Sequence, residues 1–292
     1  MQQSSIECVL RLYMPKRVPL GIIFAILMSH TLQAAPPRQL RDLAYAESPA
    51  GSLRFDASLP AGDGLAPAVI IVHGGGWVRG DRRTNVEPLF QPLSDAGFAW
   101  FSISYSLAAN PLEVGTAVTD VEAAIRFIRA HAAEYRIDPD RIALIGESAG
   151  GQLASMAALG RDSGIKAVVA FYTPTDMVAL ARTSPLIPDG IRKQMTGTVW
   201  ASLILARLGQ MSPVQAIHKN MPPFLLIHGD QDPMVPLSQS TAMCEQMNTV
   251  GVACRLITVP GAGHGLRRWE PAAYQREMVN WLRERLSVAE IL

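Results

Sequence analysis

Short, uninterrupted runs of apolar and β-branched residues recur along this chain, and they restrict the folds that it can adopt. The run AVIIV at residues 68–72 is typical of a strand that is buried on both faces. Helical patterns of apolar residues occupy 111–134, 238–250 and 271–286, between or after such runs. Further strand-like runs lie at residues 99–105, 142–145, 167–171, 224–227 and 255–259. Strands that alternate with helices predict an α/β fold with a mostly parallel sheet of about eight strands and helices on both faces.

Two segments depart from this rhythm. Residues 53–59 alternate apolar and polar side chains, which predicts an edge or half-buried strand. Residues 172–222 form a cap insertion over one end of the sheet, with an amphipathic helix expected at 199–208. The insertion carries an apolar set that we expect to be buried, either as a small separate core or as a wall of a substrate pocket that includes Trp200. This set consists of Met195, Val199, Trp200, Leu203 and Leu208.

The first 35 residues have the layout of a secretory signal peptide. Basic residues precede an apolar run at 18–28, and small residues follow at Ala34 and Ala35. The run is too short to span a bilayer as a stable helix, although an uncleaved anchor is the alternative interpretation. We therefore expect a periplasmic or secreted protein whose residues 36–292 form one catalytic domain, with no stable membrane span after removal of the signal.

Composition and motifs exclude several classes of function. The net charge of +1 offers no basic surface for nucleic acid, and no phosphate-binding G-x-x-x-x-G-K-[ST] loop is present in the sequence. The Cys and His residues lack the spacing of zinc ligands, so we expect neither a metal nor a cofactor.

The pentad Gly146-Glu147-Ser148-Ala149-Gly150 matches G-x-S-x-G and lies between a predicted strand and a predicted helix. This is the placement of a nucleophile elbow, in which small neighbours allow a sharp turn that exposes the serine hydroxyl. Ser148 is therefore the candidate nucleophile. A capping serine in a glycine-rich turn is the alternative.

The segment His73-Gly74-Gly75-Gly76-Trp77 directly follows the first buried strand. Three glycines let the backbone curl and present N–H groups to a tetrahedral oxyanion, so Gly75 and Gly76 are candidate donors together with Ala149. His73 is expected to brace the loop rather than react. Trp77 either walls the substrate pocket or packs in the core.

A base and an orienting acid for Ser148 are expected after the last two strands. His264 lies in a glycine-rich loop after residues 255–259, and Asp232 follows residues 224–227. Loops at the carboxyl ends of parallel strands meet at one edge of the sheet. Asp230 competes for the orienting role, but we expect it to stabilise its loop while Asp232 reaches His264.

These motifs together resemble the α/β-hydrolase superfamily, and in particular its HGGG-bearing esterase/lipase branch. HGGGW, GESAGG, HGDQDPMVP and VPGAGHG occur in the chain order of that fold, and HGGGWVRGDRR is most similar to feruloyl and acetylxylan esterases. The resemblance implies a Ser148–His264–Asp232 triad, an oxyanion hole at Gly75, Gly76 and Ala149, and a small-molecule or polysaccharide-linked ester as substrate. It also implies that Glu147 supports the elbow. An amidase, formamidase or peptidase, or a non-catalytic binding protein on the same fold, remains open.

Two cysteines remain after the predicted signal, Cys244 and Cys254. An even count in an exported protein and a turn near Gly251 are compatible with a disulfide. Two buried thiols are the alternative.

Overall fold

The computed structural model describes residues 36–49, 51–108, 115–160, 163–184, 192, 198–266 and 271–287. The predicted signal segment therefore lies outside the described residues, and the chain from Pro36 to Leu292 makes up one compact unit. None of the helices in the described part of the chain combines the length and the hydrophobicity that crossing a bilayer requires.

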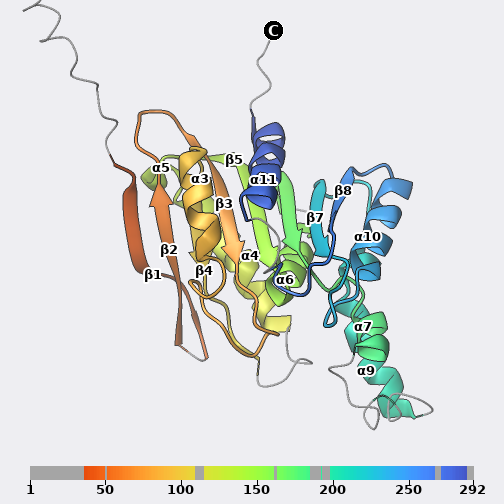
Figure 1. Ribbon diagram of the computed structural model, residues 1–292. Coiled ribbons are helices and arrows are strands. Elements are labelled where there is room, and N and C mark those ends of the chain that lie inside the picture. The colour runs from red at the N-terminus through yellow and green to blue at the C-terminus, as the bar shows by residue number, and fades with distance from the viewer. Residues whose placement is uncertain are drawn as a thin grey trace, which may run out of the picture. The chain divides into compact units, whose positions relative to one another are not determined.

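An eight-stranded sheet forms the centre of this unit (Figure 1). Its spatial order is β1-β2-β4-β3-β5-β6-β7-β8; β2 is antiparallel to both β1 and β4, and the remaining neighbours are parallel. The strands are β1 Arg38–Ser48, β2 Gly51–Leu59, β3 Ala66–Val72, β4 Ala99–Ile103, β5 Ile137–Glu147, β6 Ala167–Phe171, β7 Phe224–Gly229 and β8 Cys254–Val259. The prediction of a mostly parallel α/β sheet is confirmed.

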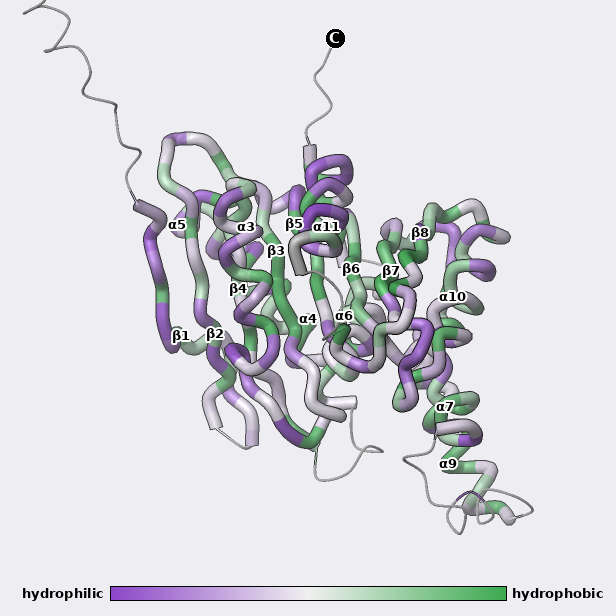
Figure 2. Tube along the Cα trace, viewed as in Figure 1, coloured by the Kyte–Doolittle hydropathy of each residue, from purple (hydrophilic) through white to green (hydrophobic). Residues whose placement is uncertain are grey.

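Helices cover both faces of the sheet, because side chains of the central strands alternate between two apolar layers. Ile70 belongs to the layer that includes α4, α6 and α10, whereas Ile71 belongs to the layer that includes α3 and α11. The helices are α3 Phe90–Asp95, α4 Gly115–Ala130, α5 Ala132–Tyr135, α6 Ala149–Ala158, α7 Met177–Thr183, α9 Val199–Gln210, α10 Ser238–Thr249 and α11 Pro271–Leu286, with 3₁₀ turns η1 Glu87–Leu89 and η2 Pro213–Ala216. Figure 2 shows the hydrophobic course of β3 between these layers.

The edge of the sheet differs from the prediction. β1 is the outer strand and pairs with β2, so the segment expected at the edge lies one position further in and buries Phe55, Ala57 and Leu59. The sequence pattern did not predict β1, because this strand is largely exposed and hydrophilic (Figure 2) and lacks the apolar run of a buried strand. β5 also starts earlier than predicted, at Ile137, and its register with β3 shifts before Ile142.

The insertion buries fewer apolar side chains than expected. α9 packs against α7, and it buries Ala201 and Leu208. Val199, Trp200 and Leu203 are 77%, 76% and 56% exposed, so the expectation that the apolar set is buried is wrong for these three. A helix that contacts its neighbours along one side leaves its other side to solvent, whatever its hydropathy. Met195 lies outside the described residues.

Candidate active site

Ser148 occupies the sharp turn between β5 and α6. Its φ of 50° and ψ of −119° lie in a region that side-chain-bearing residues rarely adopt. A Cβ on Gly146 would lie 2.4 Å from the carbonyl oxygen of Gly150, and a Cβ on Gly150 would lie 2.2 Å from that of Val72. The flanking glycines are therefore required by the close approach of α6 to β3 and β5, while the strained backbone belongs to Ser148 itself.

A continuous hydrogen-bond chain links Ser148 to the loops after β7 and β8. The Nε2 atom of His264 lies 2.9 Å from the Oγ atom of Ser148, and its Nδ1 atom lies 2.7 Å from Oδ2 of Asp232. Asp230 instead accepts a hydrogen bond from the backbone N–H of Gly261 at 2.7 Å. Of the two acids, Asp232 is thus the one in contact with the imidazole, and Asp230 ties the two loops together.

The environment of Asp232 keeps its carboxylate ionised. Burial by itself would raise the pKa of Asp232, but hydrogen bonds from His228, His264 and the backbone N–H of Val235 hold that pKa below its usual range. The second oxygen, Oδ1, accepts hydrogen bonds from the backbone N–H groups of Met234 and Val235, each at 2.9 Å. A fixed negative charge beside Nδ1 is what a general-base histidine needs to stabilise its protonated form.

His228 supports this acid from the buried side. It is fully buried, its Nε2 atom lies 2.8 Å from the carbonyl oxygen of Val235 and 3.4 Å from Oδ2 of Asp232, and its Nδ1 atom lies 2.7 Å from Oγ of Ser240. A carbonyl oxygen can only accept, so Nε2 carries a proton in this arrangement. His228 is therefore a structural residue that holds the carboxylate of Asp232 in place.

Glu147 and Tyr172 form a second buried pair beside the elbow. Burial raises the pKa of Glu147 to about 7, although a hydrogen bond from Tyr172 opposes the shift. The ring of Tyr172 meets the His264 ring edge-on, with centroids 4.7 Å apart. Glu147, which precedes Ser148, is thus connected to His264 through the ring of Tyr172.

The glycine-rich loop after β3 has the backbone curl that its sequence predicts. Gly75 and Gly76 have φ angles of 128° and 62°, and a Cβ on Gly75 would lie 2.0 Å from the carbonyl oxygen of Arg79. His73 is buried and stacks on Tyr105 with centroids 4.3 Å apart, and burial lowers the pKa of its imidazole. A neutral, stacked imidazole suits the bracing role expected of it.

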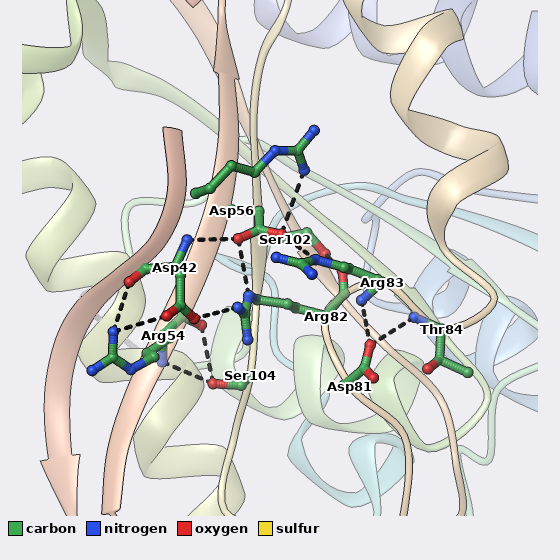
Figure 3. Close-up of polar contacts among 10 residues, drawn as sticks. Asp42, Arg54, Asp56, Asp81, Arg82, Arg83, Thr84, Ser102 and Ser104 are labelled. Carbon is green, nitrogen blue, oxygen red and sulfur yellow. Dashed lines mark hydrogen bonds and ion pairs between the residues drawn. The ribbon is translucent and has the colours of Figure 1, made fainter. Parts of the chain in front are cut away.

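Ion pairs fasten the far end of this loop to the edge of the sheet (Figure 3). The carboxylate of Asp56, on β2, is fully buried and lies 3.1 Å from Nε of Arg82 and 2.6 Å from Nε of Arg83. It also accepts a hydrogen bond from the backbone N–H of Asp42 at 2.8 Å and lies 3.4 Å from Arg41. Burial would raise the pKa of Asp56, but these donors hold it below its usual range.

Comparison of the sequence with known protein families assigns this chain to one of them. The sequence profile of the BD-FAE family matches residues 55–247, which is about two thirds of the chain. This chain belongs to the BD-FAE family. The resemblance to the esterase branch of the α/β-hydrolases is thereby confirmed.

Individual relatives of this BD-FAE chain carry esterase names. The probable carboxylic ester hydrolase LipM of Mycobacterium tuberculosis is 31% identical over 205 residues, which are 64% of this chain and 46% of the relative. Esterase LipQ of the same organism is 30% identical over 68% of this chain and 50% of its own length. This chain therefore spans about half the length of the curated relatives that it matches.

Two solved structures of esterases match over nearly their whole length. A truncated carbohydrate esterase from gut microbiota has a TM-score of 0.71 at 26% identity, over 87% of this chain and 98% of that one. Esterase 2 of Thermogutta terrifontis, phosphonylated by sarin, has a TM-score of 0.69 at 25% identity, over 85% and 96%.

The remaining site residues predicted for this BD-FAE chain differ in burial. Ala149 opens α6 beside Ser148 and is buried, and the first N–H groups of a helix have no partner within it. Trp77 is 8% exposed and packs in the core, with its indole N–H donating to Gln152 at 2.9 Å. Trp200 is largely exposed to solvent at the start of α9, and its place in a substrate pocket stays a prediction.

Three residues with evident roles in this site were missed by the sequence analysis: Asp56, Gln152 and Tyr172. Tyr172 directly follows β6, and the rule that strand ends carry site residues was a signal for it. Asp56 and Gln152 gave no comparable signal, because their partners come from distant segments. Within the described residues, no group of three or more His, Cys, Asp or Glu side chains is arranged to hold a metal ion.

Cys244 of α10 and Cys254 of β8 are joined by a disulfide in the structure. Their Cα atoms are 5.1 Å apart, inside the range of about 4.4–6.8 Å that a disulfide requires. The bond ties a helix that follows the Asp232 loop to the strand that precedes the His264 loop.

Proposed function

We propose that this protein is a serine carboxylic-ester hydrolase that works through an acyl-enzyme. The observation that carries the proposal is the hydrogen-bond chain from Ser148 Oγ through His264 to Asp232, built at the turn with the strained serine. Membership of the BD-FAE family and the esterase names of the relatives support the same reaction.

The reaction follows from these contacts. Ser148 Oγ attacks the carbonyl carbon of the ester while His264 Nε2 takes its proton. The negative charge that develops on the carbonyl oxygen is met by backbone N–H groups of Gly75, Gly76 and Ala149. The tetrahedral intermediate collapses as the bond to the alkoxy oxygen breaks, and His264 donates its proton to the leaving alcohol. Water, deprotonated by His264, then attacks the acyl-enzyme and releases the acid.

The substrate class is proposed as short-chain, acetyl or feruloyl esters, free or linked to a polysaccharide. The carbohydrate esterase among the structural neighbours supports this choice. Assays with short p-nitrophenyl esters, acetylated xylan, methyl ferulate and N-formylkynurenine separate ester from amide substrates. Turnover of the formamide alone would replace the esterase proposal by a formamidase.

Ser148→Ala is the decisive variant for the nucleophile. We expect turnover of p-nitrophenyl acetate to fall below a few per cent of wild type, with an unchanged melting temperature, because only one hydroxyl is removed. Ser202→Ala, on the exposed side of α9, is the matched control and should be fully active. A fluorophosphonate should add one phosphonyl group at Ser148 in wild type and none in Ser148→Ala. Substantial activity in Ser148→Ala would end the proposal.

Export is proposed as well, with residues 1–35 acting as the signal and the mature protein in the periplasm or outside the cell. The disulfide supports an oxidising compartment. Cell fractionation and N-terminal sequencing of the recovered protein test this, and a cytosolic protein with an intact N-terminus would contradict it.

A further inference from the structure

The buried side-chain amide of Gln152 connects three segments around the active site: the turn at Ser148, the glycine-rich loop and the insertion. The hydrogen-bond chain of the triad does not join these segments. Gln152 lies on α6 one turn after Ser148, and it is 0% exposed. Its Oε1 atom accepts a hydrogen bond from the indole N–H of Trp77 at 2.9 Å, and its Nε2 atom donates to the carbonyl oxygen of Met211 at 2.8 Å. A buried polar side chain with both ends occupied has only one arrangement that satisfies it.

The orientation of this amide follows from its two partners. An indole nitrogen only donates, and a backbone carbonyl only accepts. Oε1 of Gln152 must therefore face Trp77 and Nε2 must face Met211, and a flipped amide would lose both bonds. The backbone N–H of Gln152 bonds to the carbonyl oxygen of Ser148 at 3.2 Å, so the side chain is held at a fixed distance from the elbow.

Trp77 needs such a tether. It directly follows Gly75 and Gly76, and its own φ of 67° is in the left-handed region, which is an outlier for a bulky residue. A strained conformation persists only where the surroundings determine it. Its carbonyl oxygen accepts a hydrogen bond from the backbone N–H of Ala108 at 2.9 Å, and Gln152 holds the indole.

Met211 brings the insertion into the same connection. It caps the C-terminus of α9, and the next residue, Ser212, accepts a hydrogen bond from the backbone N–H of Met177 at the start of α7. The position of the Met211 carbonyl oxygen is thus fixed by the two helices of the insertion. The glycine-rich loop at residues 73–77 is called the oxyanion loop below. Through Gln152, the insertion and this loop share one buried hydrogen-bond network.

We propose that Gln152 is a positioning residue that sets the oxyanion loop through Trp77 and couples it to the insertion through Met211. The inference rests on the proposed esterase function. It predicts that losing this amide displaces the N–H groups of Gly75 and Gly76 and weakens transition-state stabilisation more than substrate binding.

The test uses two variants that break the same bond from opposite sides. Gln152→Met keeps the length of the side chain and removes both hydrogen bonds, whereas Trp77→Phe removes the indole N–H. Since displacement of catalytic groups by about 1 Å can cost on the order of 100-fold in rate, we expect kcat for p-nitrophenyl acetate to fall by about 10- to 100-fold in each variant. KM should change by less than about twofold. Gln246→Met, on the exposed side of α10, should match wild type.

Two further readouts separate positioning from a general loss of structure. The affinity of a trifluoromethyl ketone, which forms a tetrahedral adduct with a nucleophilic serine, should fall by the same factor as kcat/KM. The double variant should lose little more than Gln152→Met alone, because both changes remove one interaction. If either single variant fails to fold, the other, analysed with the ketone, still decides.

Wild-type kcat in the two folded variants, or losses that simply multiply in the double variant, would overturn the inference. Equal losses in kcat and in ketone affinity for Gln246→Met would also overturn it, because the effect would not be specific to the buried amide. Failure of the esterase proposal gives a different result, since Ser148→Ala would then remain active and wild type would not be phosphonylated at Ser148.

Discussion

Replacement of Asp56 by asparagine tests how strongly the edge of the sheet holds the oxyanion loop. The Asp56 carboxylate is fully buried and accepts hydrogen bonds from Arg82, Arg83 and the backbone N–H of Asp42, with Arg41 at 3.4 Å. Asparagine keeps one accepting oxygen but turns an N–H₂ group toward guanidinium donors.

The magnitude follows from the bonds that are lost. Each hydrogen bond to a charged group contributes about 1.5–3 kcal/mol, and the contribution of Arg83 is reduced because its side chain is 49% exposed. Arg82, at 15% exposure, loses its buried carboxylate partner and keeps only the ion pair with the exposed Asp42. We expect Asp56→Asn to lower the free energy of unfolding by about 3–4 kcal/mol, which corresponds to a melting temperature lower by on the order of 10 °C.

Thermal melts and urea titrations of the domain at pH 7 measure this difference. The pKa of Asp56 is lowered in the folded state, so its contribution is complete above the unfolded value of about 3.9 and is lost as pH falls below it. The gap between wild type and Asp56→Asn should therefore be constant above about pH 5 and shrink steadily as the pH is lowered below about 3.9. Asp63→Asn, which removes a solvent-exposed ion pair with Arg136, is the matched control and should melt like wild type. A melting temperature for Asp56→Asn within about 2 °C of wild type, or a gap that does not depend on pH, would refute the reasoning.

Three further predictions concern the acid, the disulfide and the insertion. Asp232→Asn should lower kcat by on the order of 10³- to 10⁴-fold, as the loss of an orienting acid does in other triads, while Asp230→Asn should chiefly lower stability. Steady-state kinetics of both variants test this, and a larger loss of kcat for Asp230→Asn would show that the wrong acid was assigned. Cys244→Ser should lower the free energy of unfolding by about 2–3 kcal/mol for its short loop, and Cys254→Ser by the same amount; two thiols that react with iodoacetamide in the exported protein without reductant would contradict the bond. Trp200→Ala should leave the melting temperature unchanged, since its side chain is largely exposed, and kcat/KM across acyl lengths reports whether it contacts substrate.

The triad candidates and the central strands could be predicted because both depend on local patterns. Ser148 was recognisable from its glycines between a strand and a helix, and His264 from its position after the last strand. The strand ends of a parallel sheet meet at one edge, so chain order alone was enough to bring these residues together. The apolar runs of β3 and β6 reported burial directly, because a strand covered on both faces has no polar alternation.

The residues that hold the site together depend on contacts between distant segments, and only the tertiary structure reveals them. Asp56 is a single acid on an alternating strand, and nothing near it in sequence shows that Arg82 and Arg83 will surround its carboxylate. Gln152 has the pattern of an ordinary helical residue until Trp77 and Met211 are placed at its two ends.

The sequence by itself determined the fold class and the identity of the candidate nucleophile, acid and base. These features could be predicted because periodicity and motif spacing are local patterns of a few residues. The tertiary structure alone decided that Trp77 points into the core and that Trp200 stays in solvent. These choices are made by side-chain packing and by the pairing of buried polar groups, whose partners lie far apart in the chain. Buried donors and acceptors in a folded protein are nearly always hydrogen-bonded. Local sequence patterns do not identify which distant residue will be the partner.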